Sequence, residues 1–123
     1  MRRSLVLLAA ALLCALAAPS ASAADAVRGE EIYNSRCIAC HSPDANRVGP
    51  KHRGVVGRSA GTVPDFNYSK ALKGSGVVWT EVTLDKWLTN PQAYIPGQRM
   101  NFKVADPADR ADLIAYLMSL SQP

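Results

Sequence analysis

The C-terminal part of the chain carries a regular helical pattern. Four apolar residues recur there at positions that share one face of an α-helix: Leu113, Ile114, Leu117 and Leu120. Asp106-Pro107 precedes them, and this pair is a strong helix start because the carboxylate caps free N–H groups while proline fits the first helical position. We therefore predict a helix that begins at Asp106-Pro107.

The segment after Asp25 predicts another helix, which runs to about Arg36. Asp25 can accept hydrogen bonds from the free N–H groups of its first turn. Three apolar residues are expected to weight one side of this helix: Val27, Ile32 and Tyr33. Gly29 costs the helix about 1 kcal/mol relative to alanine, a cost that a close crossing with a second helix would explain.

The middle of the chain combines long loops with short helices. Residues 42–67 are rich in glycine, proline, serine and asparagine, which predicts loop. A helical turn fits Ser69–Lys73, and Val77–Trp79 is at most a short extended piece. Thr80 or Thr83 can begin a helix that Asn90-Pro91 ends. The expected fold class is all-α, with three to five helices and loops that would be unusually long for a domain packed only on its own core.

The N-terminus has the layout of a secretory signal peptide. A basic Arg2-Arg3 start is followed by the apolar run Ser4–Ala18 and by the small residues Ala21-Ser22-Ala23. The run is shorter than the roughly 20 residues that span a bilayer, so an uncleaved membrane anchor is the weaker alternative. We predict a signal peptide over residues 1–23, a single domain over residues 24–123, and export to a bacterial periplasm.

Composition narrows the class of protein. Of the 123 residues, 48% are hydrophobic and 20% charged, as in ordinary globular domains. The net charge of +4 falls to +2 when Arg2-Arg3 leave with the leader, and the chain has no long basic run, which argues against nucleic-acid binding. A mature domain of about 100 residues often gains stability from a cofactor or metal.

The motif Cys37-Ile38-Ala39-Cys40-His41 has the C-x-x-C-H spacing of c-type haem attachment. In that chemistry two thiols add to the haem vinyl groups, and the histidine binds the iron. A thioredoxin-like redox pair would instead follow a strand in a βαβ unit. A zinc site would need four ligands, and the mature chain adds only His52. A structural disulfide would leave His41 unexplained.

A six-coordinate iron would need a second axial ligand, for which three side chains are candidates: Met100, Met118 and His52. Met100 lies in Tyr94–Met100, an irregular segment with a Pro-Gly turn signal that can present a thioether. Met118 falls within the C-terminal helical pattern and is expected in the core or on the helix surface. His52 lies in a polar, basic stretch, and we expect a solvated loop histidine.

Several further motifs occur in a fixed order along the chain. They are Gly29–Tyr33, Gly49-Pro50, Gly54–Arg58, Phe66–Ser69, Trp79, Asn90-Pro91, Tyr94–Met100 and Arg110–Leu117. With the C-x-x-C-H motif among them, the sequence resembles class I cytochrome c, the small soluble type found in mitochondria and bacteria. The resemblance covers essentially the whole mature chain and implies a cytochrome c fold wrapped around one covalent haem c.

The resemblance also implies roles for matching residues. Cys37 and Cys40 would attach the haem, and His41 and Met100 would be its axial ligands. Pro50 would offer its carbonyl to the second ring nitrogen of His41, a contact that fixes the orientation of a ligating imidazole.

Three more residues match positions that hydrogen-bond a buried haem propionate: Arg58, Tyr68 and Trp79. A buried carboxylate needs such donors to offset its lost hydration. Each residue also has a plainer explanation: a surface charge for Arg58, simple packing for Tyr68 and an ordinary core aromatic for Trp79.

Three positions depart from mitochondrial relatives. Trp87 stands where a tyrosine usually hydrogen-bonds the methionine sulfur, Leu72 where asparagine is common, and Gln98 where threonine is common. The resemblance therefore does not extend to the polar network beside Met100, and the ligand assignment is retained.

The implied function is one-electron transfer by a periplasmic carrier, not an enzyme. Its partners would be membrane complexes, such as a quinol–cytochrome c reductase and a terminal oxidase or photosynthetic reaction centre, docked transiently by a monomer. Arg36, Arg47 and Arg99 match positions near the exposed haem edge, and the small net charge predicts only a mild salt dependence. Two alternatives stay open: a cytochrome subunit of a periplasmic dehydrogenase, and a ligand-binding or peroxidatic haem protein if Met100 does not bind iron.

Overall fold

The computed structural model of the protein describes residues 16–18 and 22–123. Within these residues it contains five helices and no strand, only an isolated bridge between Ser59 and Val78. The helices are α1 (Ala26–Arg36), α2 (Lys70–Lys73), α3 (Glu81–Thr89), α4 (Pro91–Tyr94) and α5 (Pro107–Ser119). The all-α expectation is confirmed. Most of the predicted signal peptide lies outside the described residues.

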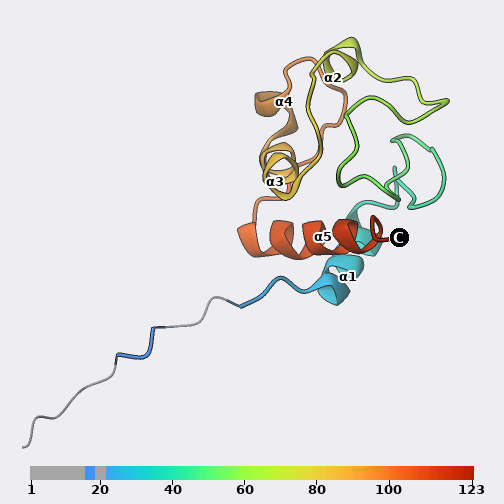
Figure 1. Cartoon of the computed structure of the whole chain (residues 1–123). Helices are drawn as coiled ribbons and strands as arrows, with labels where there is room; N and C mark the ends of the chain where they lie inside the picture. The colour runs from blue at the N-terminus through green and yellow to red at the C-terminus, as the bar shows by residue number, and fades with distance from the viewer. Residues whose placement is uncertain (1–15, 19–21) are drawn as a thin grey trace, which may run out of the picture.

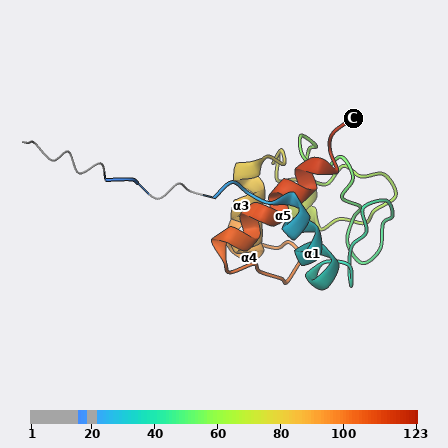
Figure 2. The same ribbon diagram turned by 90° about the horizontal axis from the view of Figure 1, so that it is seen from below.

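Helices α1 and α5 cross along one side of the molecule, and the shorter helices and the long loop between α1 and α2 lie on the other (Figure 1). The view from below again shows α1 against α5 (Figure 2). Helix α5 also packs on α3, which contacts α4. No helix in the described part of the chain is both long and apolar enough to cross a membrane.

The crossing requires a glycine in α1. A Cβ on Gly29 would overlap the backbone carbonyl of Asp112 and the side chain of Tyr116 in α5. Ile32 and Tyr33 continue the same buried face three and four residues later. Val27 is 69% exposed, so the prediction that it lies on the apolar side of this helix is wrong. Two residues correspond to about 200° around a helix, and Val27 therefore lies nearly opposite Gly29.

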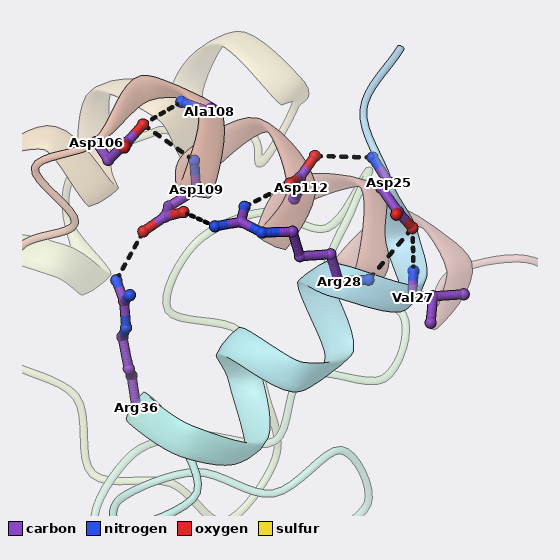
Figure 3. A network of polar contacts seen from close by, with 8 residues as sticks. All are labelled: Asp25, Val27, Arg28, Arg36, Asp106, Ala108, Asp109 and Asp112. Atoms are coloured by element: carbon purple, nitrogen blue, oxygen red, sulfur yellow. Dashed lines mark hydrogen bonds and ion pairs between the residues drawn. The ribbon is translucent and has the colours of Figure 1, made fainter. Parts of the chain in front are cut away.

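Ion pairs tie α1 to α5 around this crossing (Figure 3). The Arg28 guanidinium pairs with Asp109 at 2.5 Å and with Asp112 at 2.6 Å, and Arg36 pairs with the other oxygen of Asp109 at 3.0 Å. The backbone N–H of Asp25 donates to Asp112 at 2.8 Å. Three arginine–carboxylate contacts and a backbone donor thus fix the register of the two helices.

The predicted helix starts coincide with the observed caps. Asp25, Ser69 and Asp106 each accept backbone N–H groups at the starts of α1, α2 and α5. Thr80, not Thr83, is the N-cap of α3, and the two form a reciprocal capping box. Asn90 ends α3 and also caps α4, a short helix that the hydrophobic pattern did not predict.

Candidate cofactor site

The molecule has a cavity of about 570 Å³, partly open to solvent, between the long loop, α3, α5 and the segment after α4. The structure brings all eight predicted site residues to its wall: Cys37, Cys40, His41, Pro50, Arg58, Tyr68, Trp79 and Met100. Apolar side chains from the core, including Leu84, Leu88 and Leu113, form much of the remaining surface. A cavity of this size lies in the range of small-molecule and cofactor sites.

The C-terminal end of α1 positions the two cysteines. Cys37 is the C-cap of α1, and its carbonyl accepts the N–H groups of Cys40 at 3.1 Å and His41 at 2.9 Å. This turn brings both cysteines and His41 to the wall of the same cavity. Neither thiol is in a disulfide. Burial raises the pKa of the Cys37 thiol to about 11, so the thiol is protonated at neutral pH.

The His41 ring is held in one orientation. Its Nδ1 lies 2.9 Å from the Pro50 carbonyl, and a carbonyl can only accept, so Nδ1 carries the proton and Nε2 keeps its lone pair. Burial lowers the pKa of His41, which keeps the ring neutral. A Cβ on Gly49 would overlap the Nδ1–Cε1–Nε2 side of this ring. A neutral imidazole with one free nitrogen is the form that binds a metal.

His52 lies in the cavity wall beside this imidazole. Its ring is stacked on that of His41, with centroids 4.1 Å apart and an interplanar angle of 25°. Its Nδ1 lies 2.9 Å from the Tyr33 hydroxyl. Burial is the main cause that lowers the pKa of His52 well below its usual value, and the nearby His41 ring and the Arg58 guanidinium act in the same direction.

The expectation of a solvated His52 is therefore wrong. The neighbouring Lys51 and Arg53 suggested solvent, but the chain turns so that this ring faces inward. Closeness in sequence to Gly49-Pro50 gives no reliable signal for this orientation, because the adjacent Arg53 is exposed.

Met100 reaches the cavity from the segment that follows α4. Its backbone N–H donates to the side-chain oxygen of Gln98, so this glutamine supports the local turn. Leu72 and Trp87 line the cavity without a hydrogen bond to the Met100 sulfur in the described structure. Met118 faces a separate, smaller pocket with Ala24, so the expectation that it belongs to the helix rather than the site agrees with its position.

Hydrogen-bond donors gather at another part of the wall. Arg58 donates to the carbonyls of Lys51 at 2.9 Å and Arg53 at 3.2 Å, and burial lowers the pKa of its guanidinium. The Tyr68 hydroxyl accepts the N–H of Val63 at 3.1 Å, which leaves its own proton to donate. Trp79 is buried, and its backbone pairs with that of Arg58.

These features fit a haem group. None of the described residues that line the cavity is acidic, whereas three are arginines: Arg36, Arg58 and Arg99. A ligand that combines a large apolar surface with carboxylates would match both the apolar wall and the excess of donors. Within the described ranges no three His, Cys, Asp or Glu side chains cluster in a way that could hold a metal ion, and no strand precedes the cysteines. The zinc and thioredoxin-like alternatives thus find no support there.

Comparison with known proteins agrees with this site. The Cytochrome c family profile matches residues 26–121. Cytochrome c 2.1 of Caenorhabditis elegans is 49% identical over 98 residues, covering 77% of this chain and 88% of that protein. Cytochrome c2 of Rhodomicrobium vannielii is 49% identical over 100 residues, covering 78% and 79%. The structure of cytochrome cH from Methylobacterium extorquens aligns with a TM-score of 0.74 at 41% identity, covering 77% of this chain and 98% of that one.

Proposed function

The chain belongs to the cytochrome c family, whose members carry one covalently bound haem c, and we propose that the cavity described above holds this group. Cys37 and Cys40 would provide the two thioether bonds. His41 and Met100 would be the two iron ligands that the protein supplies. As a member of this family the protein is an electron carrier and not an enzyme.

One observation carries this assignment. The neutral His41 ring, fixed by the Pro50 carbonyl, shares the wall of one cavity with two unpaired thiols, and none of the described lining residues is acidic. The bound group would supply a one-electron ferric–ferrous couple. With His41 and Met100 both bound to the iron, oxygen and other small ligands would be kept from it. The apolar wall would exclude water and, with the thioether ligand, favour the reduced state.

The donor cluster has a matching role. Arg58, Tyr68 and Trp79 would hold a propionate inside the cavity. Arg58 supports this because its guanidinium has only carbonyl partners in the described structure and can accept a carboxylate. The Tyr68 proton is likewise available.

The protein would act as a periplasmic shuttle. We infer export by the signal peptide over residues 1–23, with the mature domain over residues 24–123. Its partners would be respiratory or photosynthetic membrane complexes, docked through the small, brief interfaces typical of redox encounters. The relative from Rhodomicrobium vannielii named cytochrome c2 supports a bacterial carrier of this kind. Sequencing the N-terminus of exported protein tests the cleavage site, and Ala24 is the expected first residue.

An absorption spectrum of the protein exported from cells that express the whole chain tests the haem assignment. We expect haem that survives denaturation, low-spin bands, and a weak long-wavelength iron–thioether band in the oxidised form. Met100→Ala should abolish that band and let reduced protein bind carbon monoxide, whereas Met118→Leu, outside the cavity, should change neither. Protein without covalent haem from a host competent in cytochrome maturation would refute the assignment, and a high-spin wild-type spectrum would favour a ligand-binding role.

A further inference from the structure

His52 has no role in the function proposed so far, although its ring touches the proposed axial ligand. The two rings are nearly parallel, at 25°, with centroids only 4.1 Å apart. Aromatic rings in such contact resist tilting because their faces must stay in van der Waals distance. The contact therefore constrains the plane of the His41 ring, and not only its position.

The other contacts of His41 leave this constraint incomplete. The Pro50 carbonyl fixes where Nδ1 lies, but a single hydrogen bond lets a ring swing about the N–O line. Gly49 packs against the nitrogen-bearing side of the ring. Among the aromatic rings of the described residues, only His52 is stacked on a face of the His41 ring.

His52 is itself anchored from α1. The Tyr33 hydroxyl lies 2.9 Å from His52 Nδ1, and the two rings meet edge to face with centroids 5.5 Å apart. Tyr33 is 1% exposed and packs on Tyr116 of α5. The chain of contacts thus runs from the rigid α1–α5 crossing through Tyr33 and His52 to His41.

We propose that His52 is a positioning residue that sets the plane of the His41 imidazole at the iron, with Tyr33 as its anchor. The inference rests on the proposed function, because it assigns an orientation to the axial ligand. The orientation of an axial imidazole governs how unpaired spin spreads over an oxidised haem. The proton NMR shifts of the four haem methyl groups therefore respond to this orientation, and a residue that only stabilises the fold away from the iron ligands would not move them.

Three variants in the haem-loaded protein test the proposal. His52→Leu removes the flat face, His52→Phe keeps a ring but loses the Tyr33 hydrogen bond, and Tyr33→Phe keeps both rings. We expect His52→Leu to change the order or spread of the four methyl shifts. His52→Phe should retain the wild-type order, and Tyr33→Phe should displace the same resonances by a smaller amount.

Val104→Ala is the matched control. Val104 is 1% exposed in the core and does not line the cavity, so this variant should lower the melting temperature and leave the methyl shifts unchanged. Wild-type shifts in His52→Leu would overturn the proposal, and so would equal changes in His52→Leu and His52→Phe. If His52→Leu does not accumulate, unchanged shifts in Tyr33→Phe would overturn it as well. Failure of the haem assignment itself is seen separately, in the wild-type spectrum.

Discussion

The α1–α5 crossing is closed by the chain's own side chains, whereas the opposite side surrounds a cavity of about 570 Å³. At the crossing, Arg28 meets two carboxylates and Gly29 meets backbone across the interface. On the cavity side, residues 37–69 have no helix or strand and are held by scattered loop hydrogen bonds. The α1–α5 crossing is thus packed entirely by residues of this chain, whereas the cavity side leaves room for a bound ligand.

This difference explains how so small a domain tolerates so long a loop. A loop of this length has too little regular structure to bury its own polar backbone, and a large apolar ligand gives it a surface to pack on. The haem would then act as part of the core. The cavity side is expected to depend on the ligand for stability far more than the crossing does.

Removal of the covalent attachment should have the largest effect. We expect Cys37→Ser/Cys40→Ser to lose covalent haem and about 4 kcal/mol or more of unfolding free energy, because a tightly held ligand stabilises only the folded state. Urea denaturation and haem retention after denaturation measure this. In hydrogen exchange, amides of residues 42–68 should lose more protection than those of α1 and α5.

Ala39→Ser is the matched control for this double variant. It adds a hydroxyl to the same exposed turn and keeps both thiols. A double variant that unfolds at the same urea concentration as Ala39→Ser would show that the cavity side is stable without the ligand.

A methyl group in the crossing should have the next largest effect. Gly29→Ala places a Cβ against the Asp112 carbonyl, and such overpacking costs about 1–3 kcal/mol. We expect a lower urea midpoint with the haem spectrum unchanged. Glu30→Ala, on the exposed side of the same helix, should keep the wild-type midpoint, and equal midpoints for the two variants would contradict the close approach.

Acid should weaken the crossing by a smaller amount. Arg28, with Arg36, lowers the pKa of Asp109 below its ordinary value of 3.8, and the Asp25 N–H and Arg28 lower that of Asp112. A carboxyl group whose pKa is lowered in the folded protein stabilises that protein at any pH above its ordinary, unfolded-state pKa. This stabilisation is lost as the pH falls through the lower folded-state pKa. The melting temperature should therefore drop below about pH 4.

Asp109→Asn provides the comparison for this pH profile. It should melt at a lower temperature than wild type at pH 7. This difference in melting temperature should become smaller as the pH falls below 3.8. A constant gap down to about pH 2.5 would mean that the lost stability does not come from the ionised carboxylate.

Ionic strength should have the smallest effect. Of the three arginines expected near the haem edge, Arg36 is paired with Asp109 in the crossing. Arg47 and Arg99 donate to backbone carbonyls and form no ion pair with a carboxylate of the described residues. With so little charge left for steering, the second-order rate of electron transfer to a redox partner should fall by about threefold or less between about 20 and 200 mM salt. A tenfold fall would show that other cations steer the encounter.

Local sequence determined the elements and the chemistry. Caps such as Asp25 and Asp106 act within a few residues, so the helix starts could be predicted, and the all-α class followed from them. The C-x-x-C-H spacing is also local, because its three side chains lie on one turn after α1. The cytochrome c family that these motifs indicated is confirmed by the family match, while the roles of the individual site residues stay predictions.

The tertiary structure decided which side of each segment faces inward. Val27 is apolar and was expected on the buried side, but it is exposed. The close approach of Gly29 to Asp112 makes the Gly29 side of α1 the face that packs on α5, and Val27 lies on the opposite side. His52 stands between basic neighbours, yet its ring packs on His41 and its Nδ1 lies 2.9 Å from the hydroxyl of Tyr33 in α1. Both outcomes depend on contacts between residues far apart in the chain or on the path of a loop, and hydrophobic periodicity within a short window contains neither.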